Sequence, residues 1–251
     1  MLICFAAVPI AAKTAGRIES RPTKAVVQPA AARAIEPAAP SAGGVIAIDR
    51  SAALHAGVST DVLNLAVGAV SCGIASGDIQ APPTLTLIDY SLPSTTPRLW
   101  VFDLRSGKLL FNELVAHGRN SGDNMATRFS DAMESKESSI GLFLTADTYV
   151  GHNGYSLRLD GLEPGFNAHA RERAIVMHGA AYVDANIAKT NGRLGRSWGC
   201  PALREAVARQ VIDTVRGGGL IFSYYPDATW LKRSKFLNCA SATEPATVAT
   251  N

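Results

Sequence analysis

The chain has 251 residues, of which 47% are hydrophobic and 18% are charged. This composition is typical of a globular protein with one good core plus extensions, and it excludes a chain that is disordered throughout. The formal net charge of +3 is mild, and because no basic and aromatic residues cluster together, the sequence does not indicate nucleic-acid binding.

The chain opens with an uninterrupted apolar run from Leu2 to Ala12. This run is too short to span a bilayer but has the length of a signal-peptide core, so we predict a signal peptide over residues 1–12. No basic residue precedes it, and a buried strand is the alternative, which Pro9 disfavours. Cys4 lies inside the run rather than at its end, so no lipoprotein anchor is expected. We therefore expect an exported protein, with no stable membrane anchor after the leader is removed.

Residues 13–44 are rich in alanine, proline and charged residues and contain few large hydrophobic residues. Such a segment buries too little surface to offset its ordering entropy, so it is predicted to be a flexible tether. Residues 45–80 follow with apolar positions at helical spacing, and Ser59-Thr60-Asp61 are of the types that begin helices. This segment is interpreted as a helical extension, either packed on a catalytic domain or a plain helix pair.

Residues 81–226 are predicted to form a strand-rich domain, and residues 227–251 a C-terminal tail. Apolar and β-branched runs mark the strands, and residues 105–108 form a hairpin turn between the second and third of them. The predicted strands are Thr84–Tyr90, Leu99–Leu104, Leu109–Val115, Ile140–Thr145, Ser156–Leu159, Ala174–Met177 and Leu220–Tyr225. The fold class expected is a β-dominated α+β domain with an N-terminal helical extension.

Cys200 ends a loop rich in glycine and arginine, RLGRSWGCP over residues 193–201. From Pro201 to Val215 apolar residues recur every fourth position, which predicts an amphipathic helix with Pro201 in its first turn. Cys200 would then lie next to the N-cap, where unpaired backbone N–H groups and the helix dipole stabilise a thiolate. The same N–H groups could hold an oxyanion.

A proton acceptor for this thiol lies 22 residues upstream, in the sequence AIVMHG of residues 174–179. The run predicts a buried strand that ends at His178, and Gly179 allows the chain to turn directly afterwards. Cys200 and His178 therefore form a plausible Cys-His couple.

These motifs resemble a known family. His-Gly, a loop of about twenty residues and Ser-x-Gly-Cys is similar to the signature of the YkuD-type L,D-transpeptidases, which cross-link murein. The wider text is similar to a divergent branch, the murein L,D-transpeptidase catalytic domain family, and it covers about half the chain, from about Leu99 to Tyr225. Its motifs are GLEPGFN at 161–167, RERAIVMH at 171–178 and NGRLGRSWGCP at 191–201. The resemblance implies a mixed β-sheet folded into a sandwich, with the cysteine in a cleft.

Carried over residue by residue, the resemblance assigns catalytic positions to Cys200 as nucleophile, His178 as base, Ser197 and Gly199. Ser197 either bonds His178 or shapes the loop.

Two departures from the pattern change what surrounds this site. Trp198 stands where most of the family has a second histidine, and is either a wall of the substrate cleft or ordinary core. Ala202 stands where an Arg or Asn usually follows, so Arg193 or Arg196 is a candidate replacement for the contact to the substrate carboxylate.

Other candidates for substrate contacts are less specific. Gly179 follows the base directly, and His117 follows a strand and is either a cleft residue or a histidine of a surface loop. Arg171 and Arg173 share one face if the chain there is extended, and are either carboxylate ligands or a solvated strand edge.

The remaining cysteines and histidines indicate no metal site. His152 and His169 have no partner at a metal-ligand spacing, so no metal and no cofactor are expected. If Cys200 stays a thiol, Cys72 and Cys239 are the pair left to form a disulfide in an oxidising compartment.

The activity expected from the resemblance is that of a cysteine acyltransferase that acts on peptidoglycan stem peptides in the periplasm or cell wall. The enzyme would be a monomer and a target of carbapenems. Cys200 would attack the bond between the L-centre of diaminopimelate and D-alanine, and an amine of a second stem would resolve the thioester. One alternative is an L,D-carboxypeptidase, in which water is the acceptor. Another is a non-catalytic wall-binding protein.

Overall fold

The computed structural model describes residues 46–239. The predicted signal peptide (1–12), the predicted tether (13–44) and residues 240–251 of the predicted tail lie outside the described residues. Within residues 46–239, no helix combines the length and apolar character that crossing a membrane requires.

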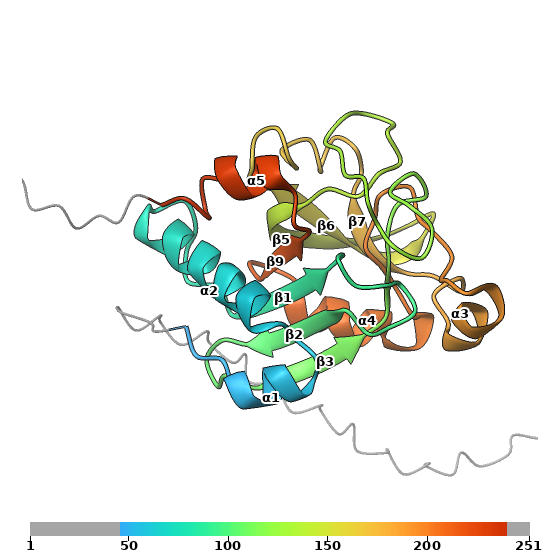
Figure 1. Ribbon diagram of the computed structural model, residues 1–251, viewed down its shortest axis with the longest axis horizontal. Coiled ribbons are helices and arrows are strands. Elements are labelled where there is room, and N and C mark those ends of the chain that lie inside the picture. The colour runs from blue at the N-terminus through green and yellow to red at the C-terminus, as the bar shows by residue number, and fades with distance from the viewer. Residues whose placement is uncertain (1–45, 240–251) are drawn as a thin grey trace, which may run out of the picture. The chain divides into compact units, whose positions relative to one another are not determined.

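The described chain alternates a few short helices with many strands (Figure 1). The helices are α1 (Arg50–His55), α2 (Thr60–Ala75), α3 (Ala185–Asn191), α4 (Glu205–Val215) and α5 (Ala228–Arg233). The strands are β1 (Thr84–Asp89), β2 (Leu99–Asp103), β3 (Leu109–Glu113), β4 (Val115–Ala116), β5 (Gly141–Gly151), β6 (Gly154–Gly161), β7 (Val176–Gly179), β8 (Ala202–Leu203) and β9 (Leu220–Tyr224). The strand positions predicted from the sequence are confirmed, with the third predicted strand divided into β3 and β4.

All nine described strands belong to one mixed sheet, in the order β3-β2-β1-β9-β5-β6-β7-β8-β4. β1 pairs with β9, and β7 with β8, in parallel, and the other neighbours are antiparallel. β3 and β4 follow each other in the chain yet stand at opposite ends of this order, so the sheet is nearly closed. The β-dominated α+β class is therefore confirmed.

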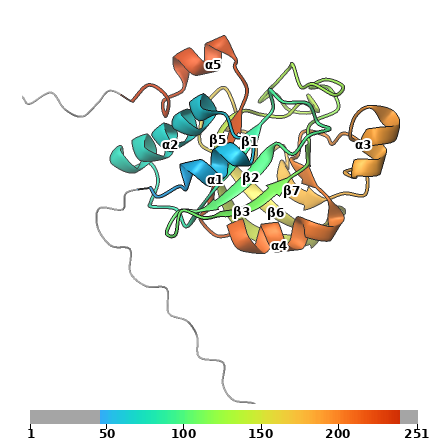
Figure 2. The same ribbon diagram turned by 60° about the horizontal axis from the view of Figure 1, so that its bottom comes forward.

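Two hydrophobic cores lie on the two faces of the central strands. In β1, Leu85 and Leu87 belong to a core that α2 and α5 cover, whereas Ile88 belongs to a second core that α4 covers. This division follows from the alternation of side chains along a strand. Figure 2 shows α1, α2 and α5 on one side of the strands and α4 on the other. Because both faces are covered, the central strands are apolar on both sides and the site lies at their ends.

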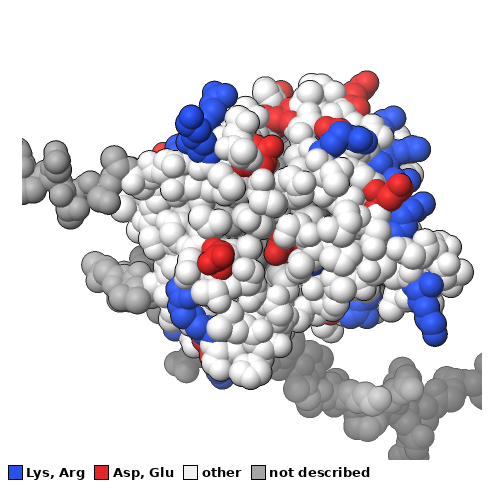
Figure 3. Space-filling view, in the orientation of Figure 1, with Lys and Arg blue, Asp and Glu red and all other residues white. Residues whose placement is uncertain are grey.

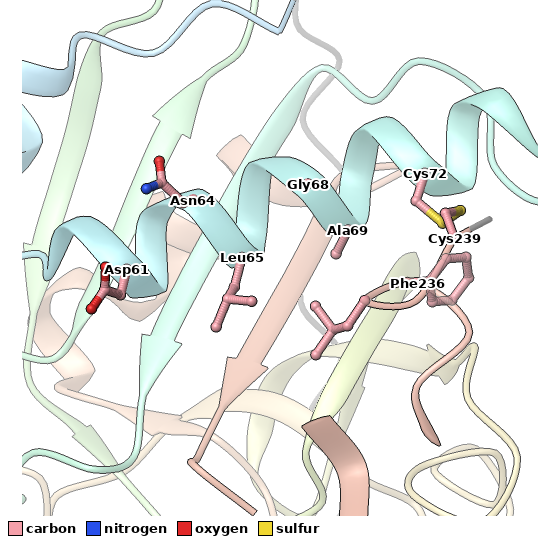
Figure 4. Close-up of a pocket in the computed structure, with 9 residues that line it drawn as sticks. Asp61, Asn64, Leu65, Gly68, Ala69, Cys72, Phe236 and Cys239 are labelled. Atoms are coloured by element: carbon pink, nitrogen blue, oxygen red, sulfur yellow. A yellow bond between two sulfur atoms is a disulfide. The ribbon is translucent and has the colours of Figure 1, made fainter. Parts of the chain in front are cut away.

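The last described residues are part of the core rather than a free tail. Trp230 of α5 is fully buried, and its indole N–H donates to the Glu163 carboxylate at 2.9 Å. Cys72 of α2 and Cys239 form a disulfide with their Cα atoms 5.8 Å apart, which is the pairing expected from the sequence. Figure 4 shows this disulfide at the end of a groove between α2 and the segment around Phe236.

The helix predicted to start at Pro201 begins instead at Glu205, with Arg204 as its N-cap. Ala202 and Leu203 form β8, which pairs with β4 on one side and β7 on the other. Apolar spacing alone did not reveal this, since Leu203 fits both the helical period and a buried strand.

Candidate functional site

Cys200 lies directly before β8, at the edge of β7. In the parallel pair of these strands His178 stands opposite Ala202. Cys200 therefore lies on the segment next to β7, the strand that carries His178. The predicted position of Cys200 at a helix N-cap is wrong, because Pro201 and β8 separate it from α4. The helix dipole of α4 therefore does not explain the state of its thiol.

The Cys200 thiol is buried and contacts the backbone that leads into β7. Its Sγ accepts a hydrogen bond from the N–H of Val176 at 3.4 Å and lies 3.7 Å from the carbonyl oxygen of Ala174. Burial raises the pKa of Cys200 above its ordinary value, while the Val176 N–H and the charge of Arg173 act in the opposite direction. At neutral pH the resting group is accordingly a thiol.

His178 is a buried residue of β7 with a defined tautomer. Its Nδ1 lies 2.9 Å from the carbonyl oxygen of Gly179, and because a carbonyl only accepts, Nδ1 carries the proton. Nε2 is then the basic nitrogen. Burial lowers the pKa of His178, so the imidazole is neutral at neutral pH. Within residues 46–239 no hydrogen bond joins His178 to Cys200.

Ser197 shapes the loop before the cysteine instead of bonding His178. Its hydroxyl donates to the carbonyl oxygen of Cys200 at 2.6 Å and accepts from the N–H of Gly199 at 3.1 Å. Gly199 has φ +122°, and a Cβ there would lie 2.7 Å from the carbonyl oxygen of Glu137. Only glycine fits both the backbone angle and this approach. The Gly199 N–H is thus occupied, whereas the Cys200 N–H has no acceptor among the described residues.

Ser138 is a residue of this loop system that sequence reasoning missed. Its hydroxyl donates to the carbonyl oxygen of Gly199 at 3.1 Å and accepts from the N–H of Gly118 at 3.0 Å. It therefore ties three segments distant in sequence. The only sequence signal was its place two residues before the predicted strand Ile140–Thr145.

Arg173 holds the loop of residues 130–139 against the same region. Its guanidinium donates to the carbonyl oxygens of Ser130 and Glu137 and to the hydroxyls of Ser135 and Ser139, at 2.6–2.9 Å. The residue is half-buried and follows a run of turns, so the extended strand considered for it does not form. Burial lowers the pKa of Arg173, while the carboxylates of Asp131 and Glu137 act in the opposite direction.

Trp198 lines a cavity of about 320 Å³ together with residues of the 130–139 loop. Its side chain is 68% exposed, which excludes the core alternative for this residue. The Nζ atom of Lys136 lies 5.0 Å from the centroid of its ring, a cation–π contact. Trp198, two residues before Cys200 in the sequence, thus forms part of the wall of this cavity.

Arg193 and Arg196 turn towards Asp123 rather than towards the thiol. Arg196 Nη1 donates to Asp123 Oδ1 and to the carbonyl oxygen of Gly122, both at 2.9 Å. Arg193 Nε lies 3.9 Å from the same carboxylate, and its Nη1 donates to the carbonyl oxygen of Leu194. A substrate carboxylate would have to compete with Asp123 for either side chain.

His117 is buried, so a histidine of a surface loop is the wrong interpretation. Its Nδ1 lies 2.8 Å from Nη2 of Arg98, which is itself fully buried. Since a guanidinium only donates, Nδ1 accepts and the proton lies on Nε2. Burial, with Arg98 as a second cause, lowers the pKa of His117 to about 4. The pair was missed because nothing in the sequence indicates that an arginine at the start of β2 turns inward.

Gly179 and Arg171 have structural partners. A Cβ at Gly179 would lie 3.0 Å from the Cβ of Ala208, so the glycine allows β7 to pack closely against α4. Arg171 pairs with the carboxylate of Asp160 on the surface.

In the view of Figure 3 the centre of the face carries few charged side chains, and most Lys and Arg side chains gather on the side of α3 and of the loops beside β7.

Comparison with known proteins gives one family match. The model of the L,D-transpeptidase catalytic domain family matches residues 54–224. No curated protein matches the chain.

Solved structures that match the chain include three L,D-transpeptidases. The protein from Mycobacterium smegmatis is 13% identical with a TM-score of 0.37, over 58% of this chain and 60% of that one. L,D-transpeptidase 1 of Mycobacterium tuberculosis is 16% identical with a TM-score of 0.32, over 58% and 63%. The protein from Stackebrandtia nassauensis is 15% identical with a TM-score of 0.34, over 64% and 66%. The match thus covers about 60% of the length of the first of these structures. Because the family match takes in more than half of the sequence, from α1 to the end of β9, the chain belongs to the L,D-transpeptidase catalytic domain family.

Proposed function

We propose that the protein is an exported peptidoglycan L,D-transpeptidase with Cys200 as its nucleophile and His178 as its base. The observation that carries the proposal is the position of the thiol. Cys200 is the free cysteine of the described residues. Its thiol contacts the N–H of Val176, which lies on β7, the strand that also carries His178, and Cys200 precedes β8, the neighbour of β7. Membership of a family that acts on peptidoglycan stem peptides supplies the substrate class.

The first half-reaction forms a thioester. His178 Nε2 accepts the thiol proton while Sγ attacks the carbonyl carbon between the L-centre of diaminopimelate and D-alanine. The Cys200 N–H, which is not otherwise engaged, is the donor available to the oxyanion. The C–N bond then breaks, and D-alanine leaves with the proton that His178 returns to its amine.

The second half-reaction transfers the acyl group. An amine of a second stem attacks the thioester carbonyl and gives a proton to His178. The C–S bond breaks, and the sulfur regains a proton from the imidazolium. The new amide is the cross-link, and water in place of the amine would give a carboxypeptidase.

Both catalytic groups start neutral, because burial raises the pKa of Cys200 and lowers that of His178. A thiolate–imidazolium pair is therefore not formed in advance, and the proton moves as the substrate is attacked. Hydrogen bonds between such groups commonly tighten only in the complex with substrate.

The test is intact-mass spectrometry of the full chain incubated with a disaccharide-tetrapeptide, and separately with a carbapenem. We expect a covalent adduct, release of D-alanine and a cross-linked dimer with the wild type. Cys200→Ala abolishes all three, and His178→Ala slows them. His152→Ala, a change at an exposed histidine between β5 and β6, leaves the rates unchanged and is the matched control.

Each other result has a defined meaning. Release of D-alanine without dimer would replace the transferase by the carboxypeptidase. Absence of any adduct or release from the wild type would leave a wall-binding protein as the better description.

A further inference from the structure

Backbone strain in the described chain gathers around one cavity. Glu134, Lys136 and Ala174 are the three non-glycine residues with positive φ among residues 46–239, at +54°, +57° and +52°. L-residues rarely adopt this conformation, and it persists where surrounding contacts enforce it, often at binding sites. Glu134 and Lys136 line the cavity of about 320 Å³ beside Trp198, and Ala174 follows Arg173, which lines it too.

One side chain makes several of the contacts that hold the loop around Glu134 and Lys136, and Asn120 adds bonds to the carbonyl oxygens of Ser135 and Lys136. Arg173 donates four hydrogen bonds to the 130–139 loop, including one to the hydroxyl of Ser135 between the two strained residues. The loop is therefore fixed before any ligand arrives, which reduces the entropy lost on binding. The same guanidinium lies beside Gly199, so the cavity adjoins the loop residue that directly precedes the proposed nucleophile.

The cavity combines both signs of charge with an apolar wall. Within residues 46–239, Lys136, Glu134 and Glu172 form no ion pair. Trp198 and Met133 are 68% and 55% exposed and form the apolar part of the lining. An anion alone would meet two carboxylates, and a cation alone would meet Lys136 and Arg173. The mixture selects a ligand that carries both charges.

We propose that this cavity binds the zwitterionic side-chain end of a stem-peptide residue. The ligand carboxylate would pair with Lys136, its ammonium group with Glu134 and Glu172, and its methylene chain would lie on Trp198. The inference rests on the proposed function, because it takes the ligand from that substrate class. It assigns recognition of the substrate to Trp198 and to the loop of residues 130–139. Trp198 stands at the position where most of the family has histidine.

A binding experiment separates this inference from the catalytic proposal. Two tetrapeptides are titrated by calorimetry into full-length Cys200→Ala, which cannot react. One carries diaminopimelate as its third residue, and the other carries lysine, which keeps the ammonium group but lacks the side-chain carboxylate. We expect the diaminopimelate peptide to bind about ten-fold more tightly, as a charge-assisted hydrogen bond in a partly enclosed site requires.

Lys136→Met in the same background should remove this preference and leave the lysine peptide unaffected. Glu172→Gln should weaken both peptides alike, because both retain the ammonium group. Lys108→Met is the matched control, since Lys108 is an exposed lysine of the β2–β3 turn, and it should behave like the parent.

Equal binding of the two peptides by the parent would overturn the inference. So would a Lys136→Met variant that keeps the preference, or one that weakens both peptides to the same degree. Failure of the catalytic proposal is detected separately, as absence of a carbapenem adduct on wild-type Cys200. Because the calorimetry uses an unreactive variant, it decides the inference in that case as well.

Discussion

The hydroxyl of Ser197 donates a 2.6 Å hydrogen bond to the carbonyl oxygen of Cys200. The hydroxyl oxygen of Ser197 also accepts from the N–H of Gly199, so one small side chain closes the turn in which the cysteine stands. Cys200 therefore stands in a turn and not at the helix N-terminus that was predicted. The turn presents the Cys200 N–H and the thiol with no contribution from the dipole of α4.

Ser197→Ala should lower both stability and reactivity, because it leaves a buried N–H and a buried carbonyl without a partner. Groups of this kind cost about 1–3 kcal/mol each when left unsatisfied. We expect a loss of that order in the free energy of urea unfolding and slower acylation of Cys200 by a carbapenem. Ser197→Thr keeps the hydroxyl and should retain most of both. An alanine variant with wild-type acylation would show that the turn holds without this side chain.

The pH dependence of Cys200 alkylation tests whether the thiol is neutral at rest. Burial raises the pKa of Cys200, and only the thiolate reacts with iodoacetamide. The rate at this residue, followed by peptide mass mapping, should therefore rise about ten-fold per pH unit from pH 6 to pH 8. A rate that is constant over this range would instead indicate a thiolate–imidazolium pair with His178.

The strands could be predicted because their evidence is local. Alternation, β-branched residues and the turn at residues 105–108 mark each strand within a few positions. The start of α4 could not be predicted in the same way. Leu203 fits a helical period, and only its pairing with Val115 of β4, far away in sequence, makes it a strand residue.

The proposed reacting groups of the candidate site stand out in the sequence, whereas the residues that support them do not. Cys200 and His178 stand out because their neighbours Gly199 and Gly179 form short motifs. Arg173 supports the loop through partners more than thirty residues away, and no local pattern distinguishes it from the surface residue Arg171. Such supporting contacts follow from the packing of the whole chain.

The disulfide should stabilise the fold without affecting the reaction. It joins α2 to the last described residues. In both ribbon views α2 lies at the opposite end of the molecule from α3, the helix that lies in the chain between His178 and Cys200. Replacing Cys72 and Cys239 by serine should lower the free energy of unfolding by about 2–4 kcal/mol. Carbapenem acylation of Cys200 at 25 °C should keep its rate. A slower acylation in the folded double variant would show that α2 influences the site.

The pair of Arg98 and His117 should make the protein sensitive to acid. Burial lowers the pKa of His117 to about 4, and the guanidinium 2.8 Å away opposes a second positive charge. In the unfolded chain the histidine takes up its proton below about pH 6.5, whereas the folded protein does so only near pH 4. Because the unfolded state binds more protons within this window, the contribution of His117 to stability is lost as the pH falls through it.

His117→Asn removes the titration and keeps an acceptor where Nδ1 stands. We expect the wild type to lose about 2–3 kcal/mol more than this variant in the free energy of urea unfolding between pH 7.5 and pH 4.5. The variant His152→Asn changes an exposed histidine and should follow the wild type, which excludes a general effect of histidine removal. If His117→Asn and the wild type lose stability equally, His117 is protonated in the folded protein and the Arg98 contact does not hold it neutral.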